Sequence, residues 1–282
     1  MAKLCWMTVI LMLVVSCSVR SFGQQLYISN EPQKSLQLMD LGTSKITTLY
    51  NIGADPDDLT TNAAGQLIYS VPSLGTVNLY DPTTKQNRML ASGLKYARDL
   101  VIEPGGQSML IAIYSPGKIM RYNFATGATS LLVSKLVTCD GIAYDPFGNL
   151  YAVANHNTIV QIHPVSGTIL GKLTLEPHVG VNGGDGMVYD SYTGSLWATH
   201  DGTTGFGLLQ IPVTATGFSQ SGFSFYATPG VRALDGVKSD GKGNLYIGAI
   251  HTVAVYNIPT NTVTKNIIAN GADGVALVPG TF

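Results

Sequence analysis

Six residues at nearly regular intervals are the main candidates for chemistry in this sequence. Five are aspartates and one is an arginine, and each directly precedes a short run rich in apolar residues. They are Asp57, Arg98, Asp140, Asp185, Asp235 and Asp273, and we call them the opening residues. Convergent carboxylates repel one another unless a proton or a cation lies between them. If the fold gathers these residues, the pattern predicts a site for a divalent metal: calcium, magnesium, manganese or, with histidine ligands, zinc.

Histidines and other polar residues recur in a second set of positions, between the second and third strand expected in each repeat. In an up-and-down sheet, these loops lie at the same end as the opening residues. A metal there could lower the pKa of a bound water, and a histidine could act as general base. The candidates from these loops are Tyr114, Asn155, His156, His200, Asp201 and His251, and a blade-entry loop adds His178 at the same end.

A purely structural explanation of the aspartates competes with the metal site. Asp-Gly before a strand is a turn signal, because the aspartate side chain accepts from nearby backbone N–H groups and glycine tolerates positive φ. A repeat copies such a residue whether or not it binds anything. Arg98 also offers a positive charge that would neutralise neighbouring carboxylates directly. Both explanations remain open from the sequence.

The elements that position these residues follow from an internal repeat. The segment from residue 140 to 170 contains four short runs of β-forming residues, separated by turns such as DPFGN and HPVSG. The same order recurs after Asp57, Arg98, Asp185 and Asp235. Each repeat therefore predicts a four-stranded antiparallel unit, and units of this length that recur along a chain indicate a propeller or a solenoid.

The two ends of the chain complete each other. The segment after Asp273 supplies one strand and then stops, whereas residues 24–51 supply the three strands that are missing. This complementarity predicts a closed ring rather than an open solenoid with capping repeats. We therefore expect residues 24–282 to form a single all-β domain, a six-bladed β-propeller whose closing blade has one C-terminal and three N-terminal strands.

The N-terminus carries a predicted export signal. Lys3 precedes an apolar run of 12 residues, from Leu4 to Val15, which is too short to span a bilayer. Residues 1–23 are a candidate signal peptide, with cleavage before Gln24. Alternatively, residues 1–16 are a lipoprotein signal, and Cys17 becomes the lipidated first residue. Either processing route predicts a periplasmic or extracellular protein, soluble or anchored to the membrane by lipid.

Composition narrows the classes of partner. The formal net charge of −1 provides no basic footprint for nucleic acid. We expect a monomer that meets a small-molecule substrate or an envelope ligand and contacts a membrane only through a lipid anchor. Cys139 is the single cysteine after residue 23, so an internal disulfide is excluded there. We interpret it as a small buried residue in preference to a nucleophile.

The repeat phrases DGIAYDPFGNLYAVAN, DGMVYDSYTGSLWATHD and DGVKSDGKGNLYIGA resemble those of the senescence-marker-protein/gluconolactonase (regucalcin-like) family. They are also similar to phrases of NHL-repeat and virginiamycin B lyase-like propellers. The gluconolactonase resemblance implies six blades and hydrolysis of sugar lactones with one divalent metal in the channel. It implies Asp57, Asp140 and Asp185 as the metal ligands, although two of the three differ in residue type from the family pattern. Asp185, within Asp-Gly-Met, would be ligand or base, and His200 or Asp201 would support it.

Three functions remain open at this point. The first is a metal-dependent hydrolase of lactones or similar small polar esters, with Asp185, His200 and Asp201 as catalytic candidates. In that case Arg98, Tyr114, Asn155, His156, His178, Asp235, His251 and Asp273 would line the substrate site. The second is a propeller that binds a ligand or a protein of the cell envelope without catalysis. The third is a lyase.

Overall fold

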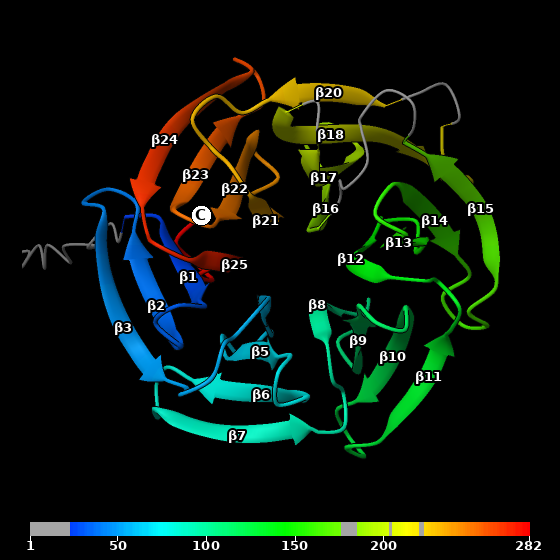
Figure 1. Ribbon diagram of the computed structural model, residues 1–282, viewed down its shortest axis with the longest axis horizontal. Helices are drawn as coiled ribbons and strands as arrows, with labels where there is room; N and C mark the ends of the chain where they lie inside the picture. The colour runs from blue at the N-terminus through cyan, green and yellow to red at the C-terminus, as the bar shows by residue number, and fades with distance from the viewer. Residues whose placement is uncertain (1–22, 176–184, 203–204, 220–222) are drawn as a thin grey trace, which may run out of the picture.

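The computed structural model describes residues 23–175, 185–202, 205–219 and 223–282, and these form an all-β structure. Six small antiparallel sheets stand in a ring around a central channel (Figure 1). This arrangement confirms the predicted six-bladed β-propeller. Within these residues, no helix is long and apolar enough to cross a membrane. The predicted signal peptide and Cys17 lie outside the described residues.

The first three blades are numbered from the one that closes the ring, and their strands run from the channel outward. Blade 1 consists of β25 (Ala272–Leu277), β1 (Gln25–Asn30), β2 (Ser35–Asp40) and β3 (Lys45–Asn51). Blade 2 consists of β4 (Leu59–Thr61), β5 (Leu67–Val71), β6 (Thr76–Asp81) and β7 (Gln86–Ala91). Blade 3 consists of β8 (Ala97–Ile102), β9 (Ser108–Ile113), β10 (Lys118–Asn123) and β11 (Thr129–Val133).

The other three blades follow the same order, with one departure. Blade 4 consists of β12 (Cys139–Tyr144), β13 (Leu150–Ala154), β14 (Thr158–Ile162) and β15 (Ile169–Thr174). Blade 5 consists of β16 (Met187–Asp190), β17 (Ser195–Gly202), β18 (Gly205–Thr214), β19 (Gly217–Phe218) and β20 (Ser224–Ala227). Blade 6 consists of β21 (Leu234–Ser239), β22 (Asn244–Ala249), β23 (Thr252–Asn257) and β24 (Thr262–Ile268).

Blade 5 differs because its third strand is long. β18 has 10 residues, so β19 and β20 both pair with it, at different points along its length. The expectation of four strands in every blade is therefore incomplete for this blade.

The ring is closed between the two ends of the chain, as the half-repeats predict. β25 pairs antiparallel with β1, and Leu26 lies opposite Leu277. The Val278 amide donates to the Gln25 carbonyl at 3.1 Å, and the Gln25 amide donates to Thr281 Oγ1 at 3.2 Å. This pairing leaves no free sheet edge between the first and the last segment of the propeller.

The turn between the first two strands of a blade is built by an aspartate. Asp145 Oδ1 accepts from the amides of Phe147 and Asn149, both at 2.9 Å, and the Tyr151 hydroxyl donates to Asp145 Oδ2 at 3.0 Å. Gly148 adopts the positive φ that the turn requires. Blade 6 repeats the arrangement around Asp240. The recurring Gly-Asn-Leu-Tyr phrase is therefore a turn signature.

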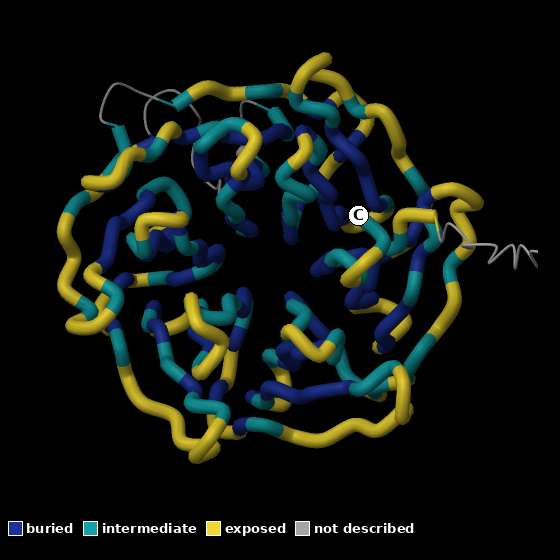
Figure 2. Tube along the Cα trace, turned by 180° about the vertical axis from the view of Figure 1, so that it is seen from behind, coloured by how far each residue is buried: buried dark blue, intermediate teal, exposed yellow. Residues whose placement is uncertain are grey.

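The apolar core lies between blades. Strands near the channel are buried and the outermost strands are largely exposed (Figure 2). Trp197 of blade 5 illustrates the packing: its ring centre lies 5.3 Å from that of Tyr226 in the same blade and 6.2 Å from that of Tyr256 in blade 6. Such contacts between neighbours fix the angle of each blade and hence the positions of the residues at the channel.

Candidate active site at the channel mouth

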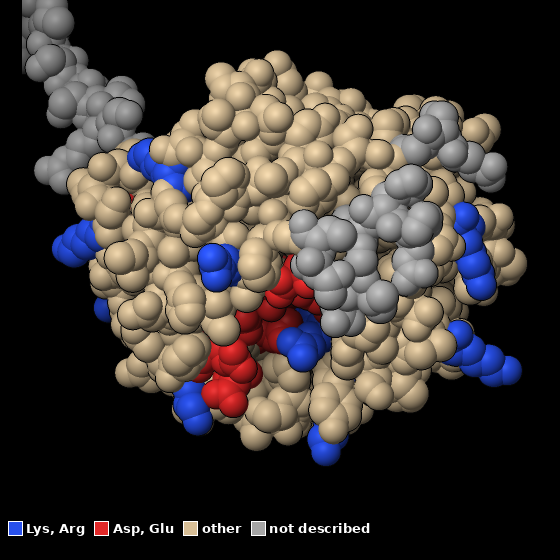
Figure 3. Space-filling model, turned by 45° about the horizontal axis from the view of Figure 1, so that its top comes forward, with Lys and Arg blue, Asp and Glu red and all other residues tan. Residues whose placement is uncertain are grey.

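The opening residues converge at one end of the channel, as the repeat predicts. Each lies at or just before the innermost strand of its blade. Four of them line a cavity of about 10 Å³ that is walled mainly by carboxylates: Asp57, Asp58, Asp99, Asp140, Asp185 and Asp235, with Gly186 and Gly236. This volume is about that required by one water molecule. Figure 3 shows acidic side chains gathered in this central hollow.

Arg98 supplies the positive charge of the ring. Its Nη1 atom lies 2.5 Å from Asp57 Oδ2, and its guanidinium lies over the ring of Tyr114, 5.4 Å from the ring centre. Burial raises the pKa of Asp57 to about 7 against the opposing effect of Arg98. Asp57, in turn, is the main cause of a raised pKa for Arg98. Asp57 and Arg98, the opening residues of blades 2 and 3, therefore form a partly desolvated ion pair.

Asp140 and Asp185 form a carboxyl pair between blades 4 and 5. Burial, followed by the negative charge of Asp185, raises the pKa of Asp140 well above its usual range. Burial also raises the pKa of Asp185, to about 6, although Arg98 and a hydrogen bond with Asp140 act in the opposite direction. Asp140 is thus the member of the pair that holds a proton more tightly. Two carboxyls with separated pKa values are suited to act as acid and base.

Blades 6 and 1 repeat this arrangement with Asp235 and Asp273. Burial and then the charge of Asp235 raise the pKa of Asp273 to about 10. Burial and then the charge of Asp185 raise the pKa of Asp235 to about 7, opposed in part by Arg98 and by a hydrogen bond with Asp273. The six opening residues thus form three neighbouring pairs, one ionic and two in which a hydrogen bond joins two carboxyls of raised pKa. Protons and one guanidinium supply the countercharge that convergent carboxylates need.

The donor arrangement does not fit the predicted metal. Among the residues that the structure describes, no group of three or more His, Cys, Asp or Glu side chains is placed to hold one ion. The three predicted ligands, Asp57, Asp140 and Asp185, are instead divided between two of the pairs described above. Arg98 lies where a cation would have to compensate Asp57, so the geometry favours an arginine in the electrostatic role of the metal.

A second charged layer, which sequence reasoning missed, crosses the channel below the opening residues. Lys238 of β21 reaches across the channel, so that its Nζ lies 3.4 Å from Asp58 Oδ1 and 3.7 Å from Asp99 Oδ1. Asp58 Oδ2 accepts from the Leu100 amide at 3.2 Å, and Asp99 Oδ2 accepts from the Ile142 amide at 2.7 Å. A signal was present, because Asp58 and Asp99 stand where the other repeats have glycine.

The predicted loop residues divide into two groups. The Tyr114 hydroxyl and His156 Nε2 are 3.2 Å apart, which joins His156 to the Arg98 side of the mouth. Asn155 precedes it in the same turn and is exposed. His251 is also exposed, and the bonds it makes there are backbone bonds from Ala269 and Asn270. His178 lies outside the described residues.

The placement of His200 differs from the loop position expected for it. β17 continues through His200 and Asp201 to Gly202, so these two residues are strand residues. His200 is 1% exposed and packs edge-on against the ring of Phe225, 5.5 Å between centres. This burial does not support a direct catalytic role for His200 at the channel mouth. Asp201 is half-buried, and its charge contributes to the raised pKa of Asp185.

Cys139 is fully buried in blade 4, as expected. Burial, with the charge of Asp140, raises the pKa of its thiol well above the usual value. A thiol that resists ionisation is a poor nucleophile.

Comparisons with known proteins support the propeller fold but do not identify a function. No family model and no curated protein matches the sequence. A chain of a nidogen/laminin complex is 14% identical, with a TM-score of 0.74, over 91% of this chain and 98% of that chain. Virginiamycin B lyase from Staphylococcus aureus is 13% identical, with a TM-score of 0.62, over 89% and 86%. A proposed gluconolactonase is 16% identical, with a TM-score of 0.57, over 80% and 86%. The resemblance noted in the sequence thus holds for the propeller fold, at low identity.

Proposed function

We propose that this protein hydrolyses a small polar lactone or ester at the channel mouth, with the Asp140–Asp185 pair as acid and base and Arg98 as the electrostatic aid. The observation that carries the proposal is the grouping of an arginine–aspartate ion pair and two carboxyl pairs at the channel mouth, beside a cavity about the size of one water. The likeness to a proposed gluconolactonase agrees with it at the level of the fold.

The proposed reaction uses only groups of this chain and one water. Asp185 takes a proton from the water while the water oxygen attacks the carbonyl carbon. Asp140 gives its proton to the carbonyl oxygen. Arg98 stabilises the negative charge that develops there. When the tetrahedral intermediate collapses, Asp140 recovers its proton, the ester C–O bond breaks, and Asp185 passes the proton that it took to the leaving alkoxide. The products are one hydroxy acid or an acid and an alcohol, and both carboxyls return to their starting states.

Small lactones and esters tested by proton release in a pH-stat provide the first test. We expect Asp185→Asn to lower kcat/KM by about 10²- to 10⁴-fold, because general acid–base catalysis contributes a factor of that size. Since the base must be ionised, the wild-type rate should rise with pH through about 6, the pKa of Asp185. Incubation with a chelator should leave the rate unchanged.

The control is Asp55→Asn, because Asp55 forms a surface ion pair with Lys34, at 3.7 Å, in which both side chains are exposed. This variant should hydrolyse at the wild-type rate. An unchanged rate in Asp185→Asn, or activity that a chelator abolishes and a divalent ion restores, would contradict the proposed mechanism.

Binding without catalysis is the second candidate, and it has its own support. The pairing of the opening residues satisfies their charges internally, which is also what a structural ring requires. The likeness to a chain of a nidogen/laminin complex shows the same fold within a protein–protein assembly. Failure of every lactone and ester tested, with an intact fold, would favour this candidate.

A further inference from the structure

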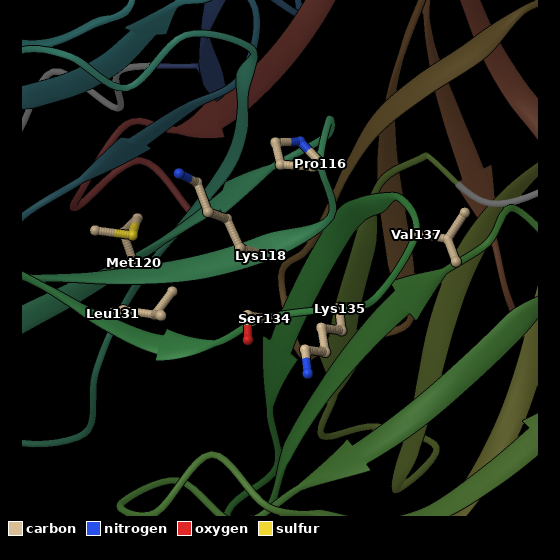
Figure 4. Close-up of a pocket in the computed structure, with 7 residues that line it drawn as sticks. All are labelled: Pro116, Lys118, Met120, Leu131, Ser134, Lys135 and Val137. Carbon is tan, nitrogen blue, oxygen red and sulfur yellow. The ribbon is translucent and has the colours of Figure 1, made fainter.

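Blade 3 carries a groove of about 600 Å³ away from the opening residues. It is formed by the β9–β10 turn, the outer strands β10 and β11, and the segment that leads to blade 4 (Figure 4). Its lining residues are Pro116, Lys118, Met120, Leu131, Ser134, Lys135 and Val137. The volume lies in the range of small-molecule sites. Two of its apolar side chains are largely exposed, Leu131 at 57% and Val137 at 68%.

Blade 2 provides an internal reference for this groove, because equivalent backbone hydrogen bonds define equivalent positions in the two blades. The Leu94 amide donates to the Gly75 carbonyl at 2.8 Å, and the Leu136 amide donates to the Gly117 carbonyl at 3.0 Å. The register shift that follows Val77 in blade 2 recurs after Ile119 in blade 3. The equivalence pairs each position of the groove with a position on blade 2.

At the positions of Lys118, Met120, Lys135 and Val137, blade 2 is polar or lacks a side chain. Thr76 corresponds to Lys118 and Asn78 to Met120, and the Asn78 amide donates to Thr76 Oγ1 at 3.0 Å. Gly93 corresponds to Lys135, and Lys95 corresponds to Val137, as the backbone packing against Gly75 and Gly117 shows. Leu74 and Met89 keep two other positions apolar in blade 2, so Met120, Val137 and the two lysines are what distinguish the blade 3 groove.

The charges of the groove are unbalanced. No acidic residue lines it, and neither Lys118 nor Lys135 takes part in an ion pair among the described residues. Lys118 is half-buried, and its ammonium group rises beside Pro116 and Met120, whereas Lys135 points away from them (Figure 4). An apolar surface with one ammonium group at its rim complements a molecule that has an apolar chain and one negative end.

The backbone beside the groove is held in an unfavourable conformation. Val137 has φ 64°, and Lys135 has φ 67°. A β-branched residue in the left-handed region is a true outlier, and such outliers gather where a ligand or a switch requires them. Here the conformation keeps the Val137 side chain exposed at the edge of the groove, and the equivalent residue of blade 2, Lys95, does not share it.

We propose that the blade 3 groove binds an amphiphilic monocarboxylate, such as a fatty acid. Its chain lies against Met120, Leu131 and Val137, and its carboxylate meets the ammonium group of Lys118. This site is separate from the opening residues and does not depend on the proposed hydrolysis.

The test is a calorimetric titration of the purified full chain with dodecanoate below its micelle concentration, at neutral pH. We expect saturable one-site binding that is at least tenfold weaker in Lys118→Thr and in Met120→Asn. Both substitutions install the residue that blade 2 has at that position, so the fold should tolerate them, and circular dichroism melting should confirm this. Lys95→Thr, which removes an exposed lysine from blade 2, should bind like the wild type.

Uncharged 1-dodecanol should bind at least tenfold more weakly than dodecanoate, because it lacks the carboxylate. The proposal is overturned if dodecanoate does not bind, or if the two blade 3 variants bind it as the wild type does. It is also overturned if the chain sediments with phosphatidylglycerol vesicles but does not bind the monomeric acid, since the partner would then be a lipid surface.

Discussion

Two sectors of the channel, one of four blades and one of two, close the same gap between innermost strands in different ways. In blades 4, 5, 6 and 1, the residue after the opening aspartate is glycine. A Cβ on Gly141 would lie 2.4 Å from the Asp185 carbonyl oxygen, and one on Gly186 would lie 2.5 Å from the Asp235 carbonyl oxygen. In blades 2 and 3, the same position is Asp58 or Asp99, whose carboxylate accepts from the next blade. One sector closes by direct backbone approach, and the other closes by side chains.

The difference has an electrostatic consequence. The aspartates of the second sector introduce buried charge, and Lys238 crosses from blade 6 to compensate it. Burial raises the pKa of Asp58 well above its usual range, while Lys238 opposes the shift. The glycine sector needs no such compensation. Stability in the two sectors should therefore depend on different interactions, charge in one and steric fit in the other.

The largest effect is expected from Lys238→Met. Removal of one partner from a buried ion pair costs about 3–5 kcal/mol, because the remaining charge loses its compensation. Urea unfolding at pH 7 should show a loss of this size. Lys238→Arg, which keeps the charge, should lose less, and the exposed Lys172→Met should be neutral. A loss below about 1 kcal/mol in Lys238→Met would remove the distinction between the sectors.

A smaller effect is expected from Gly141→Ala in the other sector. The added Cβ would overlap backbone atoms of blade 5, and overpacking of this kind costs about 1–3 kcal/mol. Gly171→Ala is the matched control, because the atoms nearest to its Cβ lie at 3.7 Å, which is ordinary contact. Urea unfolding of both variants measures the difference. Equal stability of the two variants would show that the innermost strands can separate without cost.

The smallest effect is a dependence of stability on pH. The pKa of Asp235 is raised by burial to about 7 in the folded protein. A carboxyl whose folded pKa is raised contributes stability that is fully present below its unfolded pKa and is lost as pH rises through the folded value. Its contribution should therefore fall between about pH 4 and pH 7. Asp235→Asn should flatten this dependence, as measured by melting from pH 4 to 8. If Asp235→Asn keeps the wild-type pH profile, Asp235 is not the source of the pH dependence.

The repeat made the fold and the ring of opening residues predictable, because each blade carries the same local signals at the same offset. What could not be predicted depends on single positions outside that pattern. Lys238 meets Asp58 and Asp99 across the channel, and no local spacing records a contact between blade 6 and blades 2 and 3. The division of the aspartates into hydrogen-bonded pairs also depends on burial, which the sequence shows only indirectly.

His200 shows a different limit. The repeat offset predicts a loop there, but strand pairing continues to Gly202 opposite Gly205. Because side chains alternate between the two faces of the longer strand, the imidazole of His200 lies inside the blade and contacts Phe225. An expectation carried from one blade to another thus fails where a strand is extended, even if the repeat itself is intact.

The pairing of β1 with β25 also has a consequence for the order in which the molecule can be completed. A chain that emerges from the ribosome makes β1, β2 and β3 first, but their inner neighbour comes only with residues 272–277. Until then, β1 presents an unpaired edge, which is a template for association with other chains. β25 therefore protects β1, and loss of residues 272–277 should convert a closed ring into an aggregation-prone one.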